Sequence, residues 1–153
     1  MLEIILKLAT IIRKLYWRLA RPVTIGARAI LVNPQGQVLL VRHRYDERWY
    51  LPGGAGKRDE AAEATLRREL REELGISEFS YAAELSEYLN QYEHKKDTIT
   101  VFVIKAFTFA PTGHFEIGQW SFFDPCDLPD CVSSGTRRRI EEWLDKRAIT
   151  SAW

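Results

Sequence analysis

Three glutamates near the middle of the chain are the residues whose types and spacing most directly predict chemistry. Glu72 and Glu73 follow Glu69 by three and four positions. In a helix these positions share one face, with neighbouring Cβ atoms about 5–6 Å apart. Like charges at such spacings repel one another, whereas carboxylate oxygens are ligands of Mg²⁺, often together with substrate phosphates. The spacing therefore predicts a site for a divalent cation.

The segments around these glutamates are expected to hold them in place. A helix is expected from about Asp59 to Leu74, with Gly75 as its C-terminal cap. The loop before it, Pro52 to Gly56, is rich in glycine, which lets backbone groups approach a ligand closely. The other face of the helix carries a leucine at every fourth position, which predicts packing on a sheet: Leu66, Leu70 and Leu74.

This stretch resembles the signature of the Nudix hydrolase family, in its MutT-like form. The signature reads G-x5-E-x7-R-E-U-x-E-E-x-G-U, where U is a bulky aliphatic residue, and the chain matches every position from Gly54 to Ile76. The matching residues are Gly54, Glu60, Arg68, Glu69, Leu70, Glu72, Glu73, Gly75 and Ile76. The resemblance covers about Val23 to Ala148 and implies an α/β fold, the Nudix α/β/α sandwich with a mixed sheet.

The resemblance also implies roles for these residues. Mg²⁺ or Mn²⁺ would be held by the three glutamates and by the backbone carbonyl of Gly53. Arg68 would orient the adjacent glutamates, with Glu60 as its partner and Gly54 opening the motif. The general base would be Glu69 or Glu116. The segment Glu116 to Gln119 resembles a family segment whose second glutamate is here Gln119, which can be neither a base nor an anionic ligand.

The implied reaction is attack of water on phosphorus in a nucleoside diphosphate linked to another group. The substrate class is expected to be a nucleoside triphosphate or a nucleotide sugar. The alternative is a catalytically silent Nudix domain that senses nucleotides or acts at a membrane surface. The intact set of charged residues favours the enzyme.

Candidates for substrate binding lie outside the motif. Arg28, Arg42 and Arg44 could hold phosphate, and Tyr92 lies where related hydrolases often carry tyrosine. For the arginines, exposure to solvent is an equal alternative. Other aromatic residues could stack on a base, although burial in the core is their commoner fate: Trp49, Tyr50, Tyr88 and Phe123.

The remaining sequence predicts the rest of the sandwich. Strands from Val23 to Val32 and from Gln37 to Arg44 are expected to form a hairpin through the turn Asn33-Pro34-Gln35-Gly36. The later elements are expected at Phe79 to Leu89, Thr98 to Phe109 after a polar connection at Gln91 to Asp97, Gln119 to Phe123, and a last helix at Thr136 to Ala148.

The amino-terminal segment reads as an amphipathic helix over residues 2–20. We therefore divide the chain into an extension, 1–21, and a Nudix hydrolase domain, 22–153. Charged residues inside the apolar run argue against a membrane span and a secretory signal: Lys7, Arg13, Lys14 and Arg18. The helix is expected to pack on its own domain or on a second subunit as a homodimer, with contact to an anionic membrane surface as the alternative.

Composition bounds the partners and the compartment. The chain has 153 residues and a net charge of +1, so no overall field attracts nucleic acid, and no nucleic acid partner is expected. The two cysteines, Cys126 and Cys131, have no metal-ligand spacing with the histidines. Free thiols and the absence of a secretory pattern predict a cytoplasmic protein.

Overall fold

The structure is a computed structural model that describes residues 23–80, 83–92, 95–111, 113 and 115–153. Its elements follow the chain as β1 (Val23–Leu31), β2 (Val38–His43), β3 (Trp49–Tyr50), β4 (Gly53–Ala55), α2 (Ala62–Leu74), β5 (Ala83–Tyr92), β6 (Lys95–Ile104), β7 (Ile117–Phe123) and α3 (Ser134–Trp143).

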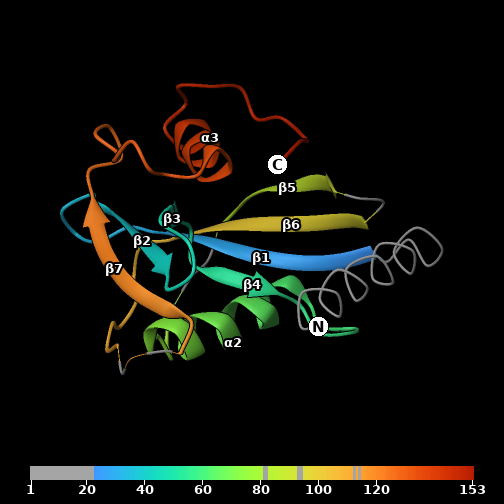
Figure 1. The fold of residues 1–153 in the computed structure, drawn as a ribbon, viewed down its shortest axis with the longest axis horizontal. Helices are drawn as coiled ribbons and strands as arrows, with labels where there is room; N and C mark the ends of the chain where they lie inside the picture. Colours follow the sequence, from blue (N-terminus) through green and yellow to red (C-terminus); the bar gives the residue numbers. More distant parts are fainter. Residues whose placement is uncertain (1–22, 81–82, 93–94, 112, 114) are drawn as a thin grey trace, which may run out of the picture.

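The described strands form two sheets. One has the order β4-β1-β6-β5, in which the central strands β1 and β6 run parallel and the outer pairs run antiparallel. The other is antiparallel with the order β3-β2-β7. The mixed sheet predicted from the sequence is confirmed. Figure 1 shows α2 on one side of the strands and α3 on the other.

Two apolar clusters separate these layers. Alternate residues of β1 face opposite sides of the sheet, as strand geometry requires. Ala29 and Leu31 pack in the cluster that contains the buried leucines of α2. Ile30 packs in the second cluster, with Tyr88 of β5 and Ile140 of α3. The sheet therefore has a helix on each face, and this is the expected α/β/α sandwich.

The first two strands do not form the predicted hairpin. The turn itself is present, since the side chain of Asn33 accepts hydrogen bonds from the backbone amides of Gln35 and Gln37 at 3.1 and 2.8 Å. After a bridge between Val32 and Val38, however, β1 and β2 enter different sheets. The reason is that both edges of β1 are occupied, by β4 on one side and by β6 on the other.

Helix α2 begins at Ala62 rather than at the predicted Asp59. Asp59 has φ 60°, a left-handed conformation that a right-handed helix cannot include. The carboxylate of Glu60 folds back and accepts a hydrogen bond from the Lys57 amide at 2.8 Å. The other end agrees with the prediction, because Gly75 caps the helix with φ 64°.

The later elements are shifted along the chain relative to the predictions. The segment Gln91 to Asp97, expected as a polar connection, contributes to both β5 and β6, because cross-strand pairing such as that of Asn90 with Asp97 satisfies its backbone. β7 begins two residues before the predicted Gln119. Helix α3 ends before the predicted Ala148, and Asp145 just beyond it has φ 56°.

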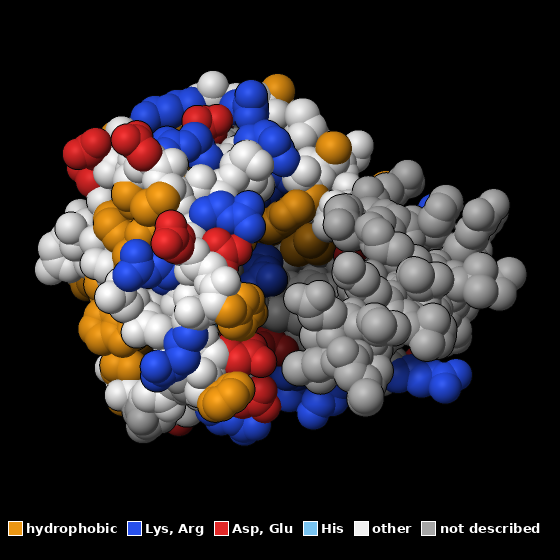
Figure 2. Space-filling model, viewed as in Figure 1, with side chains coloured by type: hydrophobic (Ala, Val, Ile, Leu, Met, Phe, Trp, Pro, Cys, Tyr) orange, Lys and Arg blue, Asp and Glu red, His pale blue; other side chains and the backbone are white. Residues whose placement is uncertain are grey.

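Several predictions concern residues outside those described. The helix over residues 2–20 and the extension 1–21 belong to this group and stay predictions. Among the described helices, none is long and apolar enough to span a membrane. Cys126 and Cys131 are both free and exposed. On the face drawn in Figure 2, acidic and basic side chains are interspersed over the described surface, as the balanced charge predicts.

A buried ion pair connects α3 to the carboxyl-terminal segment. Arg139 and Glu142 are fully buried and lie 2.9 Å apart. The hydroxyl of Tyr88 donates to Glu142 at 2.8 Å, and the guanidinium of Arg139 donates to the carbonyl of Ala152 at 2.9 Å. A buried charge is tolerated when it is paired and hydrogen-bonded in this way. The segment that follows α3 is therefore fixed against the core.

Replacing one partner of this pair is expected to destabilise the fold strongly. Glu142→Ala would leave Arg139 buried without its counter-charge, so the free energy of unfolding should fall by about 3–5 kcal/mol in a urea titration. The control is Glu141→Ala, which removes an exposed pair with Arg147 and should change it by less than about 1 kcal/mol. An equal loss of unfolding free energy in the two variants would contradict a stabilising role for the buried pair.

Candidate active site

Arg68, on α2, is the centre of the polar cluster. Its Nε and Nη2 atoms donate to the two carboxylate oxygens of Glu60 at 3.0 and 2.9 Å. Its Nη1 atom lies 2.6 Å from Glu69 and 3.4 Å from Glu72, and Nη2 also donates to the carbonyl of Ala55 at 2.9 Å. The planar guanidinium thus joins the loop before the helix to two carboxylates on the helix.

The glycine that opens the motif makes room for one of these carboxylates. A Cβ atom at Gly54 would lie 2.5 Å from the carboxyl carbon of Glu69, which is closer than real Cβ contacts. The neighbouring Gly53 has φ 123°, which L side chains rarely adopt. Pairing of β4 with β1 places Gly53 opposite Arg28. The loop backbone therefore lies directly against the glutamates.

Glu73 is the most buried of the three glutamates, with 8% of its surface exposed. Its Oε2 atom accepts a hydrogen bond from the Gly53 amide at 2.9 Å. Burial raises the pKa of Glu73 to about 7; this hydrogen bond and the charge of Arg28 oppose the rise, and Glu69 and Glu116 add to it. A buried carboxylate with two acidic neighbours is a favourable place for a cation.

Glu116 approaches this cluster from the loop before β7. It is exposed, and its carbonyl accepts a hydrogen bond from the Arg44 amide at 2.9 Å. Its charge contributes to the raised pKa values of Tyr45 and Glu73. The fold therefore brings both candidate bases, Glu69 and Glu116, to the side of Glu73. Gln119 instead accepts a hydrogen bond from Arg42.

The oxygen donors of this cluster are of the chemical type that binds a hard divalent cation. Glu69, Glu72, Glu73 and the Gly53 carbonyl offer oxygen atoms, which Mg²⁺ and Mn²⁺ prefer. Within the described part of the chain, no three acidic, histidine or cysteine side chains are grouped to hold an ion. Two of the carboxylates turn towards Arg68 and the third towards the Gly53 amide. Binding would require side-chain rotation, which the half-exposed Glu72 can undergo.

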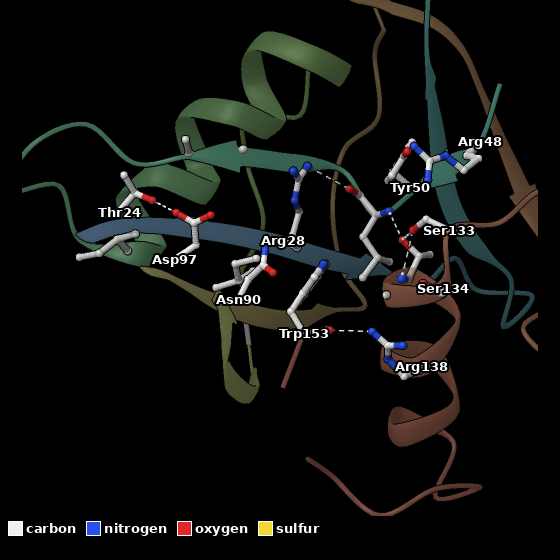
Figure 3. Close-up of a pocket in the computed structure, with 18 residues that line it drawn as sticks. Thr24, Arg28, Arg48, Tyr50, Asn90, Asp97, Ser133, Ser134, Arg138 and Trp153 are labelled. Carbon is white, nitrogen blue, oxygen red and sulfur yellow. Dashed lines mark hydrogen bonds between the residues drawn. The ribbon is translucent and has the colours of Figure 1, made fainter. Parts of the chain in front are cut away.

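A cavity of about 680 Å³ lies beside the cluster. Figure 3 shows it between the strands β1, β4 and β6 and the start of α3. Arg28 and Gly54 line the cavity. Arg28 also donates a hydrogen bond to the carbonyl of Gly53, and Gly54 lies against the carboxylate of Glu69. The volume lies in the range typical of small-molecule sites, about 300–1,000 Å³. The glutamates themselves do not line this cavity, so the cluster and the cavity are neighbouring regions that Arg28 and Gly54 connect.

The structure separates the three arginines that the sequence grouped as candidates. Arg28 lines the cavity beside the glutamates. Arg42 and Arg44 line a second cavity, of about 620 Å³. A register shift between Arg42 and His43 interrupts the alternation expected there. Tyr92 is the last residue of β5, and its side chain lies outside the description.

Most of the candidate stacking residues are in the core. Tyr88 is fully buried, and Trp49 packs edge-on against Phe123 with ring centroids 5.0 Å apart. Tyr50 lines the cavity. Sequence reasoning missed other lining residues, which share no motif and meet through strand register and the position of α3: Thr24, Asn90, Asp97, Ser133, Ser134, Thr136, Arg138 and Trp153.

Comparison with known proteins identifies the family to which this fold belongs. A family model described as NUDIX domain matches residues 22–144, and the chain belongs to this family. The chain is 47% identical over 47 residues to the RNA pyrophosphohydrolase of Hahella chejuensis (strain KCTC 2396). That match covers 31% of this chain and 29% of the relative.

Solved structures extend the likeness over most of the fold. The crystal structure of a MutT NUDIX hydrolase from Burkholderia pseudomallei is 25% identical, with a TM-score of 0.69, over 78% of this chain and 97% of that chain. The MutT protein from Methanosarcina mazei Go1 is 21% identical, with a TM-score of 0.69, over 84% and 97%. The matches to curated relatives span less than half of those proteins' lengths.

The contact between Arg68 and Glu60 predicts an unusual titration. Hydrogen bonds from Arg68, and then from the Lys57 amide, lower the pKa of Glu60 from 4.5 to about 2. The contact therefore stabilises the fold above pH 4.5, and this contribution is lost as the pH falls towards 2. Carboxyl chemical shifts measured by NMR should show Glu60 ionised down to about pH 2.

Arg68→Met should return the pKa of Glu60 towards its ordinary value. Arg71→Met is the matched control, because Arg71 is an exposed arginine one turn along the same helix. The control should leave the titration of Glu60 unchanged. An ordinary carboxyl pKa for Glu60 in the unmodified protein would show that the contact with Arg68 does not persist in solution.

Proposed function

We propose that this protein hydrolyses a pyrophosphate bond in a nucleoside diphosphate linked to another group, by attack of water on phosphorus. The observation that carries the proposal is that two residues lining the cavity, Arg28 and Gly54, also lie against the glutamate cluster or its loop. A ligand in the cavity can therefore extend its phosphates towards Glu69 and Glu73. The match to the NUDIX domain over residues 22–144 supports the same reaction class.

We assign the metal site to Glu69, Glu72, Glu73 and the carbonyl of Gly53. A bound Mg²⁺ or Mn²⁺ would supply positive charge to the phosphate oxygens and lower the pKa of a water molecule. The raised pKa of Glu73, about 7, supports this assignment, because an isolated negative charge is unfavourable at that position. Glu73 is buried between α2 and the loop and accepts a hydrogen bond from the Gly53 amide, so its carboxylate lies at the inner side of the cluster.

The other charged residues of the site position and transfer groups. Arg68 holds Glu69 on the side of the Gly54 loop, and Glu60 anchors Arg68 from the opposite side. Either Glu69 or Glu116 accepts the proton of the attacking water. Glu116 is exposed on a loop, whereas Glu69 is restrained by Arg68, so Glu69→Gln and Glu116→Gln distinguish the two assignments by their effect on kcat.

The proposed substrates are nucleoside triphosphates and nucleotide sugars. The cavity volume of about 680 Å³ is sufficient for a nucleotide, and Arg28, which lines the cavity, supplies a positive charge for phosphate. A panel of these substrates with Mg²⁺ or Mn²⁺, with the products resolved, tests the class. The panel includes 5′-triphosphorylated RNA because of the similarity to an RNA pyrophosphohydrolase.

Removing the charge of the buried glutamate should greatly reduce turnover while preserving the fold. Glu73→Gln keeps an oxygen acceptor for the Gly53 amide but removes one anionic ligand. We expect kcat to fall by about two orders of magnitude or more, because charge stabilisation in the transition state is lost. Steady-state hydrolysis of the best substrate in the panel measures this.

Glu63→Gln is the matched control, since Glu63 lies on the same helix in an exposed pair with Arg67. Its kcat should stay within about twofold of the unmodified protein, because surface pairs contribute little. Circular dichroism checks that both variants are folded. Normal turnover by Glu73→Gln would refute the assigned site, and absence of turnover on the whole panel would refute the proposed function.

A further inference from the structure

Trp153, the last residue of the sequence given, lines the cavity beside the first turn of α3 (Figure 3). The segment that carries it returns from α3 to the edge strand β5. There the amide of Leu89 donates to the carbonyl of Ser151 at 2.7 Å, and the amide of Trp153 donates to the carbonyl of Leu89 at 3.1 Å. The fold thus brings an indole from the end of the chain to the cavity beside the glutamates.

The position of this indole is fixed on several sides. Its ring packs on the first turn of α3, where a Cβ at Gly135 would lie 2.8 Å from the indole nitrogen. Tyr88 contacts it edge-on, with ring centroids 6.0 Å apart. Arg138 donates a hydrogen bond to the Trp153 carbonyl at 2.6 Å. A rigid aromatic surface loses little entropy when a ligand binds to it.

Among the described residues that line the cavity, Tyr50 carries the other aromatic side chain. Its ring is already occupied, because the guanidinium of Arg48 lies 5.5 Å from the ring centroid and His43 lies 5.7 Å away. Its hydroxyl donates to Asp46 at 2.6 Å. Trp153 also has a guanidinium near its ring, that of Arg139 at 5.6 Å. Arg139 and Tyr88, however, are fully buried in the core, whereas Arg48 itself lines the cavity beside Tyr50. Trp153 is therefore the better placed of the two for a planar ligand.

Polar groups of the sheet line the same cavity. Asn90 of β5 and Asp97 of β6 are direct cross-strand partners, and both line it. The Asn90 side chain has no hydrogen bond to any described residue, so its amide can bond to a ligand. A flat apolar ring beside hydrogen-bonding groups suits a nucleobase, which presents a π-face and a polar edge.

We propose that Trp153 stacks on the base of the bound nucleotide, with the Asn90 amide at the polar edge of that base and the phosphates directed towards Arg28. This inference rests on the proposed function, because it assigns the base of the same substrate. Trp153 acts in binding and has no part in the chemical step. Its removal should therefore raise KM and leave kcat nearly unchanged.

The first test is the kinetics of Trp153→Ala on the best nucleotide of the panel. We expect KM to rise by about tenfold or more, as for loss of one base–aromatic stack, with kcat within about threefold. Trp153→Phe should restore KM to within about threefold, because a smaller ring still stacks. Retention of the original KM by Trp153→Ala would overturn the proposal.

The control for packing is Trp143→Ala. Trp143 packs against the same apolar cluster as Trp153 and does not line the cavity. The Trp143→Ala variant should have a KM within about twofold of that of the unmodified protein, because the substitution removes a core contact and no stacking surface. Thermal unfolding of the variants checks their stability. An equal rise in KM for Trp143→Ala would show that Trp153 acts through packing, which would also overturn the proposal.

The second test does not depend on turnover. The indole N–H resonance of Trp153, identified by its absence from Trp153→Phe, is followed by NMR while AMP, GMP, CMP or UMP is added. We expect a shift with at least one of these nucleotides and none with inorganic pyrophosphate, which has no base. Failure of the unmodified protein to hydrolyse any nucleotide would refute the proposed function alone, whereas an unchanged indole resonance with all four would refute the role of Trp153.

Discussion

The site depends on the repulsion between carboxylates that share one face of α2. Arg68 restrains two of them, and burial of the third raises the pKa of Glu73 to about 7. Such a helix face is unfavourable unless positive charge is near it. Arg68 supplies part of that charge from within the protein, and Arg28 supplies more from β1. The proposed metal ion would supply the remainder.

The sandwich converts this local constraint into a binding site. The leucine face of α2 packs on the sheet, so the glutamates are held against the loop that enters β4. On the far side of the sheet, the ion pair of Arg139 with Glu142 fixes the segment that ends at Trp153. The cavity itself lies beside the start of α3 and Trp153, and Arg28 and Gly54 of its lining connect it to the glutamates of α2.

Much of the fold could be predicted because local signals carry it. Gly75 caps α2 as expected, and Arg68 contacts Glu60 as the motif from Gly54 to Ile76 predicts. The hairpin prediction failed because the pairing of β1 with β6 is non-local and has no local signal. The start of α2 was predicted too early because Asp59 adopts a left-handed conformation, with φ 60°, which its residue type does not signal. Residues that line the cavity, such as Trp153, could not be predicted either, because they meet only through contacts between segments far apart in the sequence.

The most direct measurement for the central claim is an NMR titration of isotope-labelled protein with Mn²⁺, whose unpaired electrons broaden nearby resonances. Oxygen ligands of this kind accept Mn²⁺ as well as Mg²⁺. The account predicts that broadening begins at the backbone amides of Gly53, Glu69, Glu72 and Glu73 and that excess Mg²⁺ reverses it. Broadening centred elsewhere, or none at millimolar Mn²⁺, would contradict the account.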